Sequence, residues 1–230
     1  MSARLRYLGL TAARTRAALP PLAATLFAAI GVYAYPENEP RATFAVTALM
    51  ACGLAAWFVG AVLAGEPEPQ AEMASVALGG RRERTGLEVM LVAAVSAGLT
   101  IVLLAYPLAL LALGVPKVFK PPVHGADVAA GVLAHLCCAA LGGTVGVLYA
   151  PPRLTRRATA VAAVLATLLA LIAAASVLGP VGGPVAVASA LSDDARATPL
   201  GGAVLVACGS CLVLAAGVVA AADRWARLTG

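Results

Sequence analysis

The side chains of this sequence that are best placed to act on another molecule lie in one polar stretch, residues 65–87. Within it, Met73, Val76 and Ala77 are spaced i, i+3 and i+4, which puts them on one face of a short helix. Prolines precede this helix and a glycine pair can end it. The charged residues beside this face are Glu72, Arg81, Arg82 and Arg84. The pattern indicates a docking surface for a partner, and the alternative is a solvated loop whose arginines bind lipid headgroups.

The other candidate groups lie inside long apolar runs. His135 is the clearest ionisable residue deep in such a run, and no Asp, Glu, Lys or Arg lies deep in a run to form a proton relay with it. We therefore expect a neutral His135 that is hydrogen-bonded to a neighbouring helix. Cys208 and Cys211 share one helix face, but all five cysteines fall in apolar runs, so packing is favoured over a disulfide, redox or metal role.

Enzyme signatures are absent from the sequence. It contains no His-Glu-x-x-His zinc motif, no acidic metal cluster and no Gly-x-Ser-x-Gly elbow. The phosphate-binding loop Gly-x-x-x-x-Gly-Lys-Ser/Thr is also missing. We expect that the chain is not an enzyme and that it binds no metal or other cofactor of its own.

Composition points to a bilayer as the natural solvent. Of the 230 residues, 61% are hydrophobic and only 12% are charged, whereas a soluble domain carries about a quarter charged residues. The apolar residues are mainly Ala, Leu and Val in runs of about 20, the length of a membrane-spanning helix. The expected fold class is an all-α polytopic membrane protein with six transmembrane helices. In a membrane protein the distribution of the basic residues indicates topology, so the net charge of +5 predicts no nucleic-acid partner.

We expect a single transmembrane domain over residues 1–230, which begins with a basic interfacial helix at 1–18. The expected spans are 19–35, 42–64, 88–113, 127–149, 158–178 and 200–222. Gly142 and Gly146 have the spacing that lets another helix approach closely. Segment 179–199 is broken by Gly and Pro, too apolar for an ordinary loop and too short to span. It predicts an external re-entrant hairpin, and the alternative is a hydrophobic loop packed on the helix ends.

The basic residues are distributed unevenly between the two sides that six spans would create. One side would hold twelve of the 16 Lys and Arg residues and the other would hold four. Positive charge concentrates on the cytoplasmic side of membrane proteins. Both termini and residues 65–87 are therefore expected in the cytoplasm, with the chain a multi-pass protein of the cytoplasmic membrane.

Two stretches resemble the membrane subunit of ATP-binding cassette exporters of the ABC-2 type (type V). The first is Gln70-Ala71-Glu72-Met73-Ala74-Ser75-Val76-Ala77-Leu78-Gly79-Gly80-Arg81-Arg82, which is similar to the family's coupling helix. The second is the Gly/Pro-broken hairpin at 179–199, similar to the family's external re-entrant helices. The resemblance implies an ABC ATPase subunit docked on Glu72, Met73, Val76, Ala77, Arg81, Arg82 and Arg84.

The same resemblance implies a second permease chain, identical or similar to this one, and ATP and Mg²⁺ held by the ATPase subunit. It places the substrate path at the permease dimer interface, along spans 1, 2 and 5. In this sequence the hydroxyls on that path would be those of Thr25, Thr47, Thr159 and Thr167. Such a lining suits a lipid-like, peptide or drug-like amphiphile. The main alternative is a non-transporting membrane scaffold or accessory subunit, and a lipid-modifying enzyme is disfavoured by the missing catalytic cluster.

Overall fold

The computed structural model describes residues 10, 16–34, 39–65, 81–113, 119, 123–150, 162–167, 169–170, 173, 184–193 and 202–228. Within these ranges the regular elements are helices, which confirms the expected all-α class. They are η1 (Arg16–Ala18), α2 (Leu19–Tyr33), α3 (Pro40–Ala64), α5 (Arg81–Ala112), α6 (Gly125–Leu148), α8 (Pro184–Asp193) and α9 (Gly202–Leu228).

Three helices are long and apolar enough to cross a bilayer. They are α3, the Arg84–Ala112 part of α5, and α6. Leu19–Tyr33 and Val204–Ala220 are shorter apolar helices. Large apolar side chains such as Phe27 and Val213 are about three-quarters exposed, at 76% and 73%. Surfaces of this kind are stable against lipid, so the fold is that of a membrane protein.

Residues near the N-termini of α3, α5 and α6 explain where these helices begin. Pro40 opens α3 after an extended Glu39, a position where the missing N–H of proline costs no helical hydrogen bond. The carboxylate of Asp127 in the first turn of α6 accepts a hydrogen bond from the His124 N–H at 2.9 Å. Helix α5 begins at Arg81 rather than near Glu88, because an ion pair between Arg84 and Glu88, one turn apart, supports its polar first turns.

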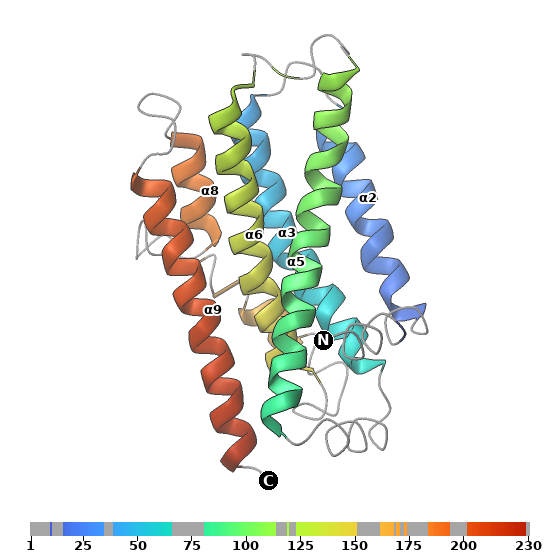
Figure 1. Ribbon diagram of the computed structural model, residues 1–230, viewed down its shortest axis with the longest axis vertical. Coiled ribbons are helices and arrows are strands. Elements are labelled where there is room, and N and C mark those ends of the chain that lie inside the picture. Colours follow the sequence, from blue (N-terminus) through green and yellow to red (C-terminus); the bar gives the residue numbers. More distant parts are fainter. Residues whose placement is uncertain are drawn as a thin grey trace.

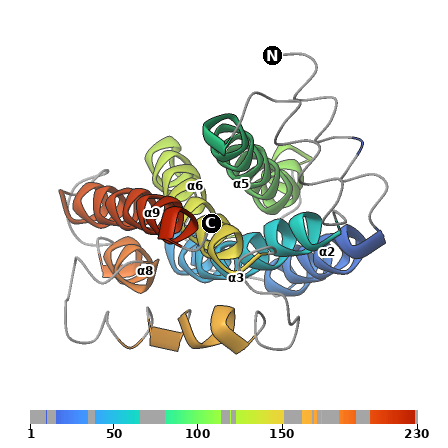
Figure 2. The ribbon, with the colours of Figure 1, turned by 90° about the horizontal axis from the view of Figure 1, so that it is seen from below.

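Helices α2, α3, α5 and α6 alternate in direction, and α9 runs parallel to α6 (Figure 1). Helices α2 and α5 run upward in that view and α3, α6 and α9 run downward, so the start of α5 and the ends of α3, α6 and α9 lie at one end of the bundle. Helix α6 lies centrally and packs against α3, α5, α8 and α9. Seen from below, α8 and α9 lie on one side of α6 and α2 on the other (Figure 2).

The contact between α3 and α6 depends on two glycines. A Cβ atom at Gly142 would overlap the backbone carbonyl of Cys52, and one at Gly146 would lie 2.5 Å from the carbonyl oxygen of Ala56. Neither position has room for a methyl group, because a real Cβ atom does not approach backbone atoms this closely. The Gly-x-x-x-Gly spacing therefore does what the sequence predicts and brings two helix backbones together.

Several expectations lie outside the described residues. These are most of the interfacial helix at 1–18, the positions Glu72, Met73, Val76, Ala77 and Thr159, and most of the expected fifth span. Of the expected hairpin at 179–199, the structure describes α8. This helix has ten residues, which is too short to cross a bilayer, and it packs on α3 and α9.

Candidate functional site

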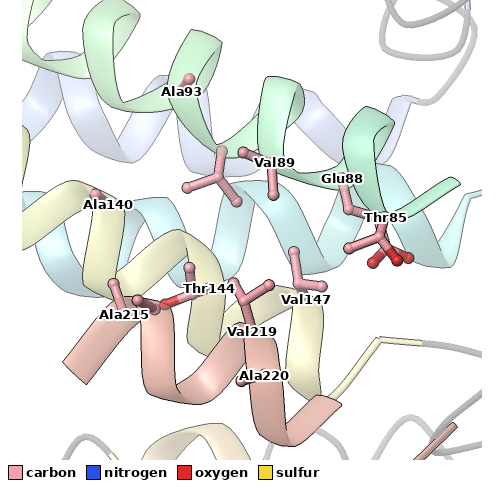
Figure 3. Close-up of a pocket in the computed structure, with 12 residues that line it drawn as sticks. Thr85, Glu88, Val89, Ala93, Ala140, Thr144, Val147, Ala215, Val219 and Ala220 are labelled. Atoms are coloured by element: carbon pink, nitrogen blue, oxygen red, sulfur yellow. The ribbon is translucent and has the colours of Figure 1, made fainter. Parts of the chain in front are cut away.

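A cavity of about 570 Å³ opens between α5, α6 and α9 (Figure 3). It lies towards the end of the bundle where α5 starts and α6 and α9 end. Its described lining residues are Thr, Glu, Val and Ala. The size is that of a small-molecule pocket.

The helical period explains how three helices share this lining. On α5, Thr85, Glu88, Val89, Val92 and Ala93 recur at three- and four-residue steps, so they form one face. Helix α9 contributes Ala215, Ala216, Val219 and Ala220 in the same way, and α6 contributes Ala140, Thr144 and Val147. The many alanines matter because their short side chains do not reach across, which leaves the space open.

The polar groups are concentrated at one end of the cavity. Figure 3 shows Thr85 and Glu88 together at the end nearest the start of α5, while Ala93 and Ala140 lie at the other. Glu88 is only 6% exposed, and its Oε1 lies 3.6 Å from Nε of Arg84 on the same helix. The Thr144 hydroxyl donates to the carbonyl of Leu141 at 2.7 Å and so serves its own helix. The cavity is therefore apolar along its length with a carboxylate at one end.

The described lining residues include two threonine hydroxyls and one carboxylate but no His, Cys or Lys. Within the described ranges, no group of three or more His, Cys, Asp or Glu side chains is arranged to hold a metal ion. An apolar cavity with polar groups at one end has the character of a site for an amphiphilic small molecule.

A second polar cluster lies in the opposite half of the bundle, around His135. Its Nε2 is 2.9 Å from Oγ1 of Thr47 on α3, and its Nδ1 is 2.6 Å from the carbonyl oxygen of Gly131. The Tyr33 hydroxyl of α2 is 3.4 Å from the same Oγ1. Thus His135 is hydrogen-bonded to a neighbouring helix, as the sequence predicts.

The carbonyl of Gly131 can only accept, so we assign the His135 proton to Nδ1. Nε2 then faces the Thr47 hydroxyl as an acceptor, while the Thr43 carbonyl lies at the same 2.9 Å from Thr47 Oγ1 as a second acceptor for that hydroxyl. The Thr47 oxygen in turn accepts from Tyr33. In this hydrogen-bonded cluster the N–H of His135 and the hydroxyls of Thr47 and Tyr33 each have an acceptor. Phe44 and Phe119 surround the cluster, with Phe44 edge-on to both the His135 ring and Phe119. The arrangement holds α2, α3 and α6 together and needs no charge.

An ion pair joins the starts of α3 and α6. Nε of Arg41 lies 2.6 Å from Oδ1 of Asp127, with side-chain exposures of 18% and 7%. The other carboxylate oxygen, Oδ2, accepts from the His124 backbone. Asp127 therefore caps its own helix and binds the neighbouring one at the same time.

Of the hydroxyls expected on a substrate path, those of Thr25, Thr47 and Thr167 lie in the part of the chain that the structure describes, and each has a hydrogen-bond partner. Thr25 is fully buried and donates to the carbonyl of Pro21 at 2.7 Å. Thr47 belongs to the His135 cluster, and the Thr167 hydroxyl pairs with Tyr149 at 2.8 Å. None of the three lines the cavity. Arg84 pairs with Glu88, while only the backbone of Arg81 and Arg82 is described.

Glu88 stands at the expected start of span 88–113, a position that by itself predicts no role at a site. The face formed by Thr85, Glu88 and Val89 was hidden because residues up to 87 were expected to be loop. The alanines of α9 do not predict a cavity either, since small residues in a span usually indicate helix packing. No family model, curated protein or solved structure matches this chain.

Proposed function

We propose that this chain is the membrane subunit of an ATP-driven exporter, moving an amphiphilic substrate with energy from a separate ATPase subunit. The observation that carries the proposal is the position of the cavity at the start of α5. Thr85 and Glu88 lie in the first turns of this helix, directly after the expected coupling segment. A partner that moved that segment would act on the cavity wall through α5.

The proposed topology has six spans with both termini in the cytoplasm. Twelve basic residues against four support it, and so does the alternating direction of α2, α3, α5 and α6. Under this topology the cavity and the coupling segment lie towards the cytoplasm. That location suits the collection of a substrate from the inner leaflet or the cytoplasm.

The proposed assembly contains a second permease chain, two ATPase subunits, and ATP with Mg²⁺ bound by the latter. Nucleotide-driven movement of the ATPase subunits would reach Glu72, Met73, Val76 and Ala77 first. The apolar triad suits a groove on the partner, because methionine adapts to irregular surfaces. Arg81, Arg82 and Arg84 then meet acidic groups of the partner or lipid headgroups. The substrate class remains an amphiphile of lipid, peptide or drug type.

The coupling face can be tested with two matched double variants. Met73→Asp with Val76→Asp places two charges on the apolar face, whereas Ala71→Asp with Ser75→Asp places two on the opposite face of the expected helix. The chain is co-expressed with an ABC ATPase whose gene is found to adjoin its own, purified, and placed in vesicles for ATP-driven export of a fluorescent amphiphile. We expect the first variant to lose ATPase binding and export and the second to keep both.

Equal behaviour of the two double variants would contradict the coupling role. If the wild-type chain bound no ATPase and exported nothing, the non-transporting scaffold would be the better description. Binding of the amphiphile to the purified chain is measured separately, without the ATPase subunit. It depends on the cavity and does not require the partner.

A further inference from the structure

The cavity between α5, α6 and α9 presents one charged side chain among its twelve described lining residues. Glu88 supplies this carboxylate, and the other lining side chains are those of threonine, valine and alanine. Glu88 is only 6% exposed and lies with Thr85 at the end of the cavity nearest the start of α5 (Figure 3). A ligand in the cavity therefore meets a negative group at one end and mainly apolar walls along the rest.

The ion pair of Glu88 with Arg84 leaves the carboxylate on the cavity wall. Nε of Arg84 lies 3.6 Å from Oε1 of Glu88, whereas the pair of Arg41 and Asp127 is closer, at 2.6 Å. A charge-assisted hydrogen bond between nitrogen and oxygen spans about 2.7–2.9 Å. Arg84 is not among the described residues that line the cavity, whereas Glu88 is. The guanidinium thus balances the carboxylate from outside the cavity, and a ligand reaches the same carboxylate from within.

The apolar walls decide which head group is stable beside Glu88. Charges interact more strongly in an apolar environment than in water, because the dielectric constant is lower there. A negatively charged head group is repelled by the carboxylate, and a neutral one gains no charge attraction. A positively charged head group loses its hydration but gains the attraction of the carboxylate in return. The lining therefore selects a cation among amphiphiles.

A second feature of the lining selects the kind of cation. Quaternary ammonium groups are recognised by the faces of Trp, Tyr and Phe rings. None of the described lining residues is aromatic. The carboxylate of Glu88 and the hydroxyl oxygen of Thr85 instead accept hydrogen bonds, which an ammonium N–H can donate. A protonated amine fits these acceptors better than a quaternary ammonium group does.

We propose that the substrate of this chain is an amphiphilic protonated amine whose ammonium group donates to the Glu88 carboxylate. Its alkyl chain contacts Val89 of α5 and Val219 of α9 and extends towards Ala93 and Ala140 at the other end of the cavity (Figure 3). The identification of this ligand as the substrate rests on the proposed exporter function, whereas its binding in the cavity does not. Under the proposed topology the ammonium group lies at the cytoplasmic end.

The test measures binding to the purified chain at neutral pH in nanodiscs of phosphatidylcholine, without the ATPase subunit. A bound fluorescent alkylamine is displaced by compounds that have saturated chains of the same length and differ in the head group. They are dodecylamine, dodecyltrimethylammonium, dodecanol and dodecanoate, and empty nanodiscs correct for partitioning into lipid. Dodecylamine should act at about tenfold lower concentration than dodecanol, with dodecyltrimethylammonium between them and dodecanoate the weakest.

Glu88→Gln and Glu39→Gln form a matched pair of variants. Both replace a carboxylate with a neutral amide of nearly the same shape, but Glu39 is exposed and precedes α3, at the opposite end of the bundle from the start of α5. Glu88→Gln should remove the preference for dodecylamine over dodecanol, and Glu39→Gln should keep it. In the wild type, dodecylamine with a photoreactive group at the end of its chain should label α5, α6 or α9, which locates the site even where a variant folds poorly.

The proposal is overturned if any of the other three compounds displaces the reporter as well as dodecylamine does. It is also overturned if the preference survives in Glu88→Gln, if Glu39→Gln loses it equally, or if the label is confined to other helices. The exporter function fails separately. Amine preference in a chain that exports nothing would keep this binding site and remove the exporter function, whereas ATP-driven export without amine preference would do the reverse.

Discussion

The Nε2 atom of His135 on α6 lies 2.9 Å from the Thr47 hydroxyl on α3, and the two residues are 88 positions apart in the sequence. Both side chains are fully buried. The Tyr33 hydroxyl of α2 reaches the same threonine oxygen. One hydroxyl therefore connects three helices, and the stability of the bundle should depend on it.

Thr47→Val should destabilise the protein, because it leaves the buried Nε2 of His135 and the Tyr33 hydroxyl without their shared partner. An unsatisfied buried polar group costs about 1–3 kcal/mol. Thr25→Val is the matched control, since Thr25 is equally buried but its hydroxyl donates to Pro21 of its own helix. Thermal unfolding in detergent should show the larger loss for Thr47→Val. Equal losses would show that the link between helices contributes nothing.

Gly142→Ala and Gly146→Ala should both weaken the contact between α3 and α6. The added methyl group meets backbone atoms of Cys52 or Ala56, which cannot turn aside as a flexible side chain can. Overpacking of this kind costs about 1–3 kcal/mol. Gly209→Ala is the control, because nothing lies within 4 Å of its Cβ position. Unfolding temperatures that rank Gly209→Ala below the other two would refute this account.

Asp127→Ala should cost more stability than Asp127→Asn. The asparagine loses the charge that binds Arg41 but keeps an oxygen that can accept from the His124 N–H. The alanine loses both, and the loss of a helix cap typically costs about 1 kcal/mol. Chemical unfolding of both variants and the wild type gives the order. An Asn variant as unstable as the Ala variant would assign the whole effect to the ion pair.

Glu88→Gln should weaken binding of a cationic amphiphile, such as a fluorescent alkylammonium compound, by about threefold to tenfold, or about 0.7–1.4 kcal/mol. The effect is moderate because Arg84 lies 3.6 Å from the carboxylate and offsets part of its charge. Arg84→Gln should act in the opposite direction and strengthen binding. Equilibrium titration in nanodiscs measures both. Changes of the same sign in the two variants would argue against a charge effect.

Ala216→Trp should abolish binding of the same amphiphile by filling the cavity. Ala216 lines the cavity on α9, whereas Val213 on the same helix does not line it and is 73% exposed. Val213→Trp therefore adds a comparable bulk to the same helix without entering the cavity and should bind as the wild type does. Retained binding in Ala216→Trp would mean that the amphiphile binds elsewhere.

Some features of this protein follow from its residues in order. Long Ala, Leu and Val runs predict helices that suit a bilayer, because only a helix satisfies its own backbone hydrogen bonds in lipid. The four-residue spacing of Gly142 and Gly146 predicts a close helix contact, since both fall on one face. The prediction that His135 bonds to another helix follows from the cost of burying an unpaired polar group. Each of these rests on local periodicity or on a general energetic rule.

The tertiary structure alone decided which partners meet. Nothing in the sequence shows that Thr47 faces His135, that Arg41 binds Asp127, or that the cysteines of α3, α6 and α9 share one buried cluster. The cavity was hidden for the same reason, because Thr85 and Glu88 line it only together with alanines that lie more than 120 positions later on α9. Periodicity fixes the face on which a side chain lies, but the rotation and neighbours of a helix depend on packing with the others. In an apolar bundle many such packings are similar in hydrophobicity, and shape complementarity selects among them.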